Sequence, residues 1–190
     1  MRKRLNVSIA IFILGTMTTP LQAEDDPNVV ALKLGSHSYV IPRDLIWMNM
    51  GRDHGPVSLG VQWPEFTVPT ILDRQEKTRR TINVSFPMGP VMTVARHIER
   101  LNELQFSPEI GDAPYGLRLL RSGLAKEFRE YIASPEGGAE YVMHCGSYSC
   151  DYYFEYLDLP VNVYFSATLL SNWRDIHQKT LSLLDGMRKD

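Results

Sequence analysis

The sequence predicts an α+β fold: an antiparallel sheet with a central amphipathic helix and a long C-terminal helix packed on one face. Short stretches that alternate apolar and polar residues fill most of the chain, which is typical of half-buried strands. Apolar residues recur at intervals of three and four in two stretches, residues 92–104 and 169–187, which indicates two helices. The regular strand–helix alternation of a doubly wound sheet is missing, so the two helices are expected to cover an antiparallel sheet.

Four strands are expected before the central helix. Gly35 and Ser36 suit a short hairpin turn between the first two strands. Pro64 ends the third strand, because proline has no N–H to donate to a neighbouring strand. The expected strands cover residues 29–34, 37–41, 57–63 and 81–86.

The second half of the chain is expected to add more strands and then the C-terminal helix. Residues 124–132 fit either a helix or a strand. Ser166 can cap the last helix, since its hydroxyl can accept a hydrogen bond from a free N–H in the first turn. The other expected strands cover residues 115–120, 141–145, 150–157 and 161–165.

Residues 1–23 have the pattern of a cleaved secretory signal peptide. Arg2, Lys3 and Arg4 precede an apolar run of about ten residues, and Ala23 supplies a small residue before the expected cleavage point. A membrane-spanning helix needs about 20 apolar residues, so no stable membrane anchor is expected after cleavage. The sequence therefore predicts a single α+β domain at residues 24–190, exported to the periplasm, with secretion from the cell as the alternative.

The charge of the chain limits its partners. The full sequence has 20 Lys and Arg against 22 Asp and Glu, a formal charge of -2. Without the three basic residues of the signal peptide, 17 basic residues face 22 acidic ones, so the exported part carries about -5. That balance disfavours nucleic acid, whose phosphates need clustered lysine and arginine. It favours a basic protein partner, because opposite charge speeds association.

The two cysteines, Cys145 and Cys150, predict a disulfide. Nearby thiols normally pair in an oxidising compartment, and the four residues between them suffice for a hairpin loop. A loop this short gives about 2 kcal/mol in the chain-entropy model. A redox pair is the alternative, but such pairs are usually C-x-x-C at a helix start. His144 adds one metal-ligating residue, which is too few for a structural zinc site, and no cofactor is expected.

The search for catalytic motifs leaves one candidate. Nucleophile-elbow, zinc-protease, phosphate-loop and dinucleotide-binding patterns are missing from the sequence. Asp53 and His54 stand together between glycines and could form a base or half of a metal site, although a polar surface turn is the simpler interpretation. His97 and His177 lie on expected helices, where a half-exposed imidazole needs no function. We therefore assign no catalytic residue.

One stretch around the disulfide is rich in tyrosine and acid. On a strand, residues 152, 154 and 156 would share one face and enter the core, which leaves the alternate residues on the other face. Tyrosine is enriched in recognition surfaces because it offers a large contact area at low entropy cost. Tyrosines are also simply good strand formers, which is the alternative. The candidate partner-binding residues are Tyr148, Asp151, Tyr153 and Glu155.

Three stretches carry a resemblance to a known family. They are residues 39–44 (YVIPRD), residues 57–66, which end in WPEF, and the segment from Cys145 to Ile176. Together they resemble a family of exported bacterial proteins associated with periplasmic immunity to type VI secretion effectors. The resemblance implies a protein partner and carries over no catalytic residues.

These observations lead to three hypotheses of function. The leading one is a periplasmic binding protein that neutralises a toxin or effector by occluding it. The second is an envelope hydrolase with a site near Asp53 and His54. The third is a structural accessory protein of the envelope.

Overall fold

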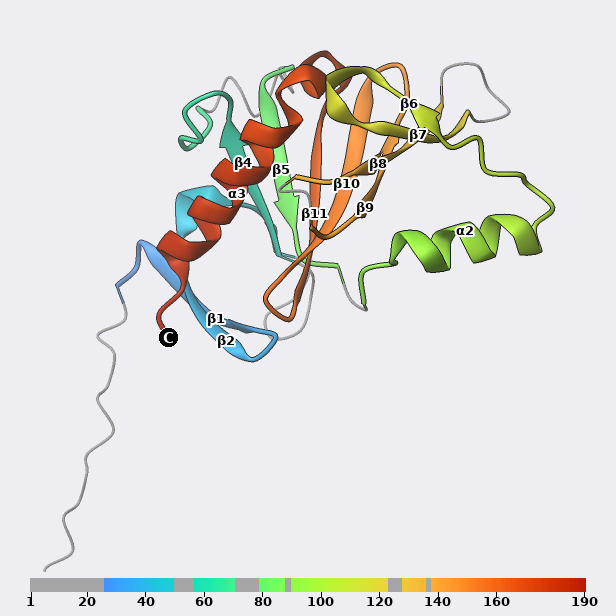
Figure 1. The fold of residues 1–190 in the computed structure, drawn as a ribbon. Coiled ribbons are helices and arrows are strands. Elements are labelled where there is room, and N and C mark those ends of the chain that lie inside the picture. The colour runs from blue at the N-terminus through green and yellow to red at the C-terminus, as the bar shows by residue number, and fades with distance from the viewer. Residues whose placement is uncertain (1–25, 50–56, 71–78, 88–89, 123–127, 136–137) are drawn as a thin grey trace, which may run out of the picture.

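The computed structural model describes residues 26–190 except 50–56, 71–78, 88–89, 123–127 and 136–137. The described part has the α+β architecture that the sequence predicts, with a large antiparallel sheet and helices against it (Figure 1). The expected signal peptide and the candidate pair Asp53 and His54 lie outside the described residues. No helix of the described residues is long and apolar enough to cross a membrane.

The strands and helices follow one another in the order that Figure 1 shows by colour. The strands are β1 (Val29–Leu34), β2 (His37–Pro42), β3 (Ile46–Asn49), β4 (Val57–Gln62), β5 (Thr81–Ser85), β6 (Gly111–Asp112), β7 (Arg118–Ser122), β8 (Arg129–Ala133), β9 (Tyr141–Cys145), β10 (Ser149–Tyr156) and β11 (Leu159–Ser166). The α-helices are α2 (Val94–Glu103) and α3 (Trp173–Met187), and the 3-10 helices are η1 (Arg43–Leu45), η2 (Pro114–Gly116) and η3 (Ala167–Asn172).

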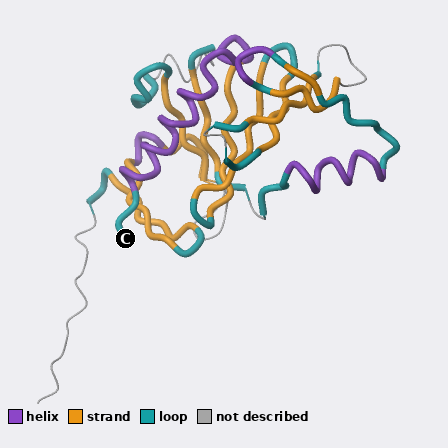
Figure 2. The backbone as a smooth tube through the Cα atoms, in the orientation of Figure 1, coloured by secondary structure: helices purple, strands orange, loops and turns teal. Residues whose placement is uncertain are grey.

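Nine strands form the large sheet, in the order β3-β4-β5-β11-β10-β9-β8-β7-β6, and the described strand pairs are all antiparallel. Figure 2 shows the strands in orange and the helices in purple. The hairpin of β1 and β2 forms a separate small sheet. Its second strand meets the C-terminal end of the chain, where Lys189 N donates a hydrogen bond to Ser38 O over 3.0 Å. The two ends of the described chain are therefore held together.

The main core lies on one face of the large sheet, which we call the α3 face. It carries Val84, Val163, Tyr152 and Met143, which lie directly opposite one another in four neighbouring strands and are fully buried. Helix α3 lies across part of this face, in front of β4 and β5 in the view of Figure 1. Trp173 is the first residue of α3, and the centroid of its ring lies 6.0 Å from the centroid of the Tyr152 ring.

The opposite face, which we call the α2 face, buries a second and smaller core. Val94 and Leu101 of α2 pack with Leu120, Ile132 and Val142 of the sheet. Because successive side chains of a strand point to opposite sides, β8 and β9 are buried on both faces. The expectation that both helices pack on one face is therefore wrong, although the sheet and the two helices are as predicted. A continuous apolar run in a strand, and not strict alternation, is the sequence pattern of such double burial.

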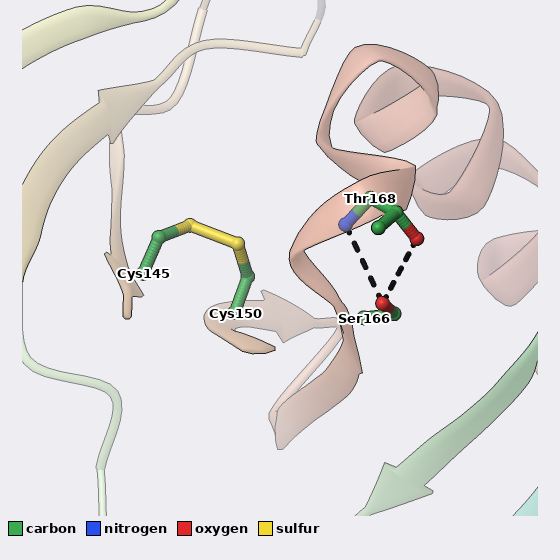
Figure 3. Close-up of a disulfide and its surroundings, with 4 residues drawn as sticks. All are labelled: Cys145, Cys150, Ser166 and Thr168. Atoms are coloured by element: carbon green, nitrogen blue, oxygen red, sulfur yellow. Dashed lines mark hydrogen bonds between the residues drawn. A yellow bond between two sulfur atoms is a disulfide. The ribbon is translucent and has the colours of Figure 1, made fainter. Parts of the chain in front are cut away.

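The remaining differences from the expected elements are local. Strands β3 and β6 are additional, and the ambiguous stretch 124–132 contributes strand β8 from Arg129 onward. The C-terminal helix begins with the 3-10 helix η3 before it continues as α3. Ser166 accepts the expected capping hydrogen bond from Thr168 N over 3.4 Å, at the start of η3 (Figure 3).

Candidate functional site

Alternate residues of strand β10 lie on opposite faces of the sheet, as the sequence predicts, so its candidate residues and its core residues are on different sides. Tyr152 and Phe154 are fully buried on the α3 face. Asp151 and Tyr153 lie half-buried on the α2 face, and Glu155 is exposed on the same side. Tyr148 lies in the turn before β10, with 88% of its surface exposed. The alternation of the strand is confirmed, and the binding role of these four residues stays a prediction.

A cleft of about 580 Å³ lies between α2 and the α2 face of the sheet. Helix α2 supplies His97 and Leu101 to its wall, and strand β10 supplies Asp151 and Tyr153. The lining is largely apolar with a few polar groups, which is the usual character of a binding cleft. Further lining residues come from the segment before α2 and from the start of β11: Pro87, Pro90, Val91, Met92 and Pro160.

A row of four charged or titratable side chains crosses the floor of this cleft. Arg121, Glu130, His144 and Asp151 belong to β7, β8, β9 and β10, and each lies directly opposite the next in the strand register. Side chains directly opposite one another in an antiparallel pair are about 5 Å apart at Cβ. We call these four residues the cross-strand row.

Glu130 is the most buried member of the row, with 5% of its surface exposed. Its Oε2 atom lies 3.2 Å from His97 Nε2 and 3.6 Å from Arg121 Nε, and its Oε1 atom lies 3.4 Å from His144 Nδ1. Burial by itself would raise the pKa of Glu130, but the hydrogen bonds and positive charge of the two histidines outweigh it. The pKa therefore lies well below its ordinary value of 4.5.

The Glu130 carboxylate also ties α2 to the sheet. His97 comes from α2, whereas the other two partners come from strands on either side of β8. The guanidinium of Arg121 stacks over the Phe106 ring at 4.5 Å, just beyond the C-terminal end of α2. Charge and packing thus fix the wall of the cleft against its floor.

Sequence reasoning missed Glu130, Arg121 and the role of His97. His97 was expected to be a half-exposed helical histidine, but only 12% of its side chain is exposed, and it contacts Glu130. One signal was available, since a glutamate at an inward position of the apolar segment REYIA implies a buried partner. Which groups would meet it depends on the strand register, which the sequence does not state.

A second recess, of about 350 Å³, lies farther along the same face. Its lining includes Trp47, Arg79, Tyr148 and Tyr164. Tyr164 lies directly opposite Asp151 and is 42% exposed, so it connects this recess with the cross-strand row. The α2 face therefore offers a continuous polar and aromatic surface between the two hollows.

The disulfide lies at the turn that carries this surface. Cys145 and Cys150 are directly opposite in β9 and β10 and are joined by a disulfide, as predicted (Figure 3). Both cysteines are buried on the α3 face. Because Asp151 and His144 are their chain neighbours, the disulfide also fixes the alignment of the cross-strand row. Among the described residues, no group of three or more His, Cys, Asp or Glu is arranged to hold a metal ion.

Comparison with known proteins adds one similarity. No protein-family model matches the chain, and no curated protein matches it. The structure is similar to a solved immunity protein of the Stenotrophomonas maltophilia type IV secretion system, with a TM-score of 0.64. The match covers 86% of this chain and 94% of that chain at 15% sequence identity, so it shows a common fold. The secretion system named for that solved protein is type IV, whereas the resemblance of the sequence is to immunity proteins of type VI effectors.

Proposed function

We propose that this chain is an exported immunity protein that binds a toxin in the periplasm and neutralises it by occluding its site. The observation that carries the proposal is the α2 face, which has an open cleft beside α2 and a polar, aromatic surface next to it. The shared fold with an immunity protein of a type IV secretion system supports it. The toxin would be a protein delivered by a competing cell.

The composition of the α2 face supports a protein partner. Tyr148 and Tyr164 are large, exposed and rigid side chains of the kind that dominate protein interfaces.

The location in the periplasm rests on the N-terminal sequence and the disulfide. Residues 1–23 have the order of basic, apolar and small residues that export machinery recognises. A disulfide persists in an oxidising compartment, and the bacterial periplasm is one. On this basis residues 24–190 form the exported domain. Its formal charge of about -5 favours a basic toxin.

Protection of cells against a toxin tests the proposal. Each candidate toxin encoded by a neighbouring gene is directed to the periplasm of a sensitive strain, together with either the full chain or a chain that lacks residues 1–23. The full chain should restore growth and should co-purify with the toxin from periplasmic extract, whereas the truncated chain should not protect. Equal protection by the two chains would contradict the periplasmic site of action, and no protection by either would contradict the function.

A pair of tyrosine variants tests which surface is used. Tyr164→Ala removes an exposed ring from the α2 face, and Tyr115→Ala removes a similarly exposed ring from η2. The first should weaken toxin binding by at least tenfold, as expected for an interface tyrosine that contributes about 1.4 kcal/mol or more. The second should bind like the unmodified chain. The reverse result would place the interface elsewhere.

A further inference from the structure

The positive and negative charges of the cross-strand row are not balanced at one of its ends. Its Glu130 carboxylate is matched by His97, Arg121 and His144, which lie within 4 Å of it. The second acid of the row, Asp151, lies at the end that faces Tyr164. Among the described residues, no lysine or arginine forms an ion pair with Asp151, and His144 is the cationic group that acts on it. The row therefore ends in a carboxylate that has no lysine or arginine partner among the described residues.

The surroundings of Asp151 make this charge costly. The residue is half-buried, and burial raises its pKa above the ordinary 3.8, a shift that Asn162 and His144 oppose only in part. A partly buried carboxylate has lost part of its hydration, and a cation that takes the place of this water stabilises its charge. A cationic side chain of a bound molecule could supply that charge from the open side of the cleft.

Two tyrosines flank the same carboxylate. Tyr153 lies two residues farther along β10 on the same face, and Tyr164 lies directly opposite Asp151 in β11. The faces of tyrosine rings attract cations, and arginine makes such contacts more often than lysine. An acid between two aromatic rings is thus suited to a planar guanidinium, which can stack on a ring and at the same time donate paired hydrogen bonds to the carboxylate.

We infer that Asp151, Tyr153 and Tyr164 form a subsite for an arginine side chain of the toxin, with an adjoining apolar side chain of the toxin seated in the cleft under α2. The inference rests on the proposed function and names the chemistry of its contact. It agrees with the basic partner that the charge of the exported chain favours.

The other charged groups of the cleft define the position of the subsite. Arg121 is held by Glu130 and by the Phe106 ring, so it is not free to bind Asp151. Arg100 of α2 lines the opposite wall and would repel a cation bound near it. The arginine of the ligand should therefore enter over β10 and β11, away from α2.

A small probe tests the subsite without the toxin. N-acetyl-phenylalanyl-arginine amide is titrated into the purified, isotope-labelled exported protein, and backbone amide shifts are followed by NMR. Saturable shifts should appear at residues 151–153 and 164. The matched citrulline peptide has the same shape without charge, and it should bind at least tenfold more weakly, because its uncharged urea group cannot form the charge-assisted hydrogen bonds that a guanidinium donates to a carboxylate.

Variants assign the effect to Asp151. Asp151→Asn keeps the side-chain shape and should weaken binding of the arginine peptide by about tenfold or more. Tyr153→Leu should weaken this binding by a smaller factor. Asp175→Asn removes an exposed acid from α3 and should change nothing, while Arg100→Ala should bind the probe equally or more tightly. Circular dichroism and thermal melting establish that each variant is folded.

Two outcomes would overturn the inference: equal binding of the arginine and citrulline peptides, or equal binding of the arginine peptide by Asp151→Asn and the unmodified protein. The proposed function fails separately, if the unmodified chain does not protect against the toxin. In cells that the unmodified chain protects, loss of protection by Asp151→Asn but not by Asp175→Asn supports the subsite, and full protection by both variants contradicts it.

Discussion

Neighbouring residues of β10 meet opposite environments, and the contrast separates stability from recognition. Phe154 is fully buried on the α3 face, where its ring lies 4.7 Å from the His177 ring of α3. Tyr153 faces the other way, into the cleft beside His144. The α3 face is a continuous apolar core, whereas the α2 face combines a small core with charges and open hollows. One strand thus serves the fold with one side and is available to a ligand with the other.

The largest effect should come from the α3 face. Phe154→Ala should lower the free energy of unfolding by about 3–5 kcal/mol, because it leaves a cavity in a close-packed core. Tyr153→Ala, one residue earlier, should cost about 1 kcal/mol or less, since its ring lies at an open cleft. Urea unfolding followed by circular dichroism compares the two variants. Similar losses for both would mean that the two faces do not divide the roles in this way.

Glu130 is the exception on the α2 face, because its charge is buried. Glu130→Gln should cost about 2–3 kcal/mol at neutral pH, since the charge-assisted hydrogen bonds from His97 and His144 are weakened or lost. The pKa of Glu130 is lowered in the folded state, so the unfolded chain takes up its proton first as the pH falls. The extra stability of the unmodified protein over Glu130→Gln is therefore fully present above about pH 4.5 and decreases below that pH.

Urea titrations of the two proteins between pH 3 and pH 7 measure this difference. Asp112→Asn, which alters an exposed acid of the edge strand β6, serves as the control and should follow the unmodified protein at each pH. A difference between Glu130→Gln and the unmodified protein that grows as the pH falls below about 4.5 would contradict the assigned role of the carboxylate.

The disulfide lies on the α3 face, beside the cross-strand row, and should have the smallest effect of the three. Replacement of Cys145 and Cys150 by serine should lower the free energy of unfolding by about 2 kcal/mol, because the closed loop is short. The melting temperature of the unmodified protein should fall in the presence of reductant, and that of the double variant should not respond. A melting temperature of the unmodified protein that ignores reductant would show that the two thiols are free.

Local patterns determined much of the fold. The hairpin of β1 and β2, the alternation of β4 and the division of β10 into a buried and an open side follow from which residues repeat every second position. The two α-helices follow from repeats at threes and fours. The disulfide follows from the spacing of the two cysteines and from the export that the N-terminal residues predict. These features depend on neighbours in the chain, which a sequence displays directly.

The placement of α2 and the cross-strand row were decided by the tertiary structure. Arg121, Glu130, His144 and Asp151 come from four strands, and only the pairing register makes them neighbours. Nothing local states that His97 meets Glu130 across 33 positions of sequence, or that α2 lies opposite α3. The sequence alone determined most of the helices and strands, the division of β10 into a buried and an open side, and the expected sign of the partner's charge. The register of the strands decided which charges are matched and left Asp151 open beside two tyrosines, because contacts between distant segments exist only in the folded chain.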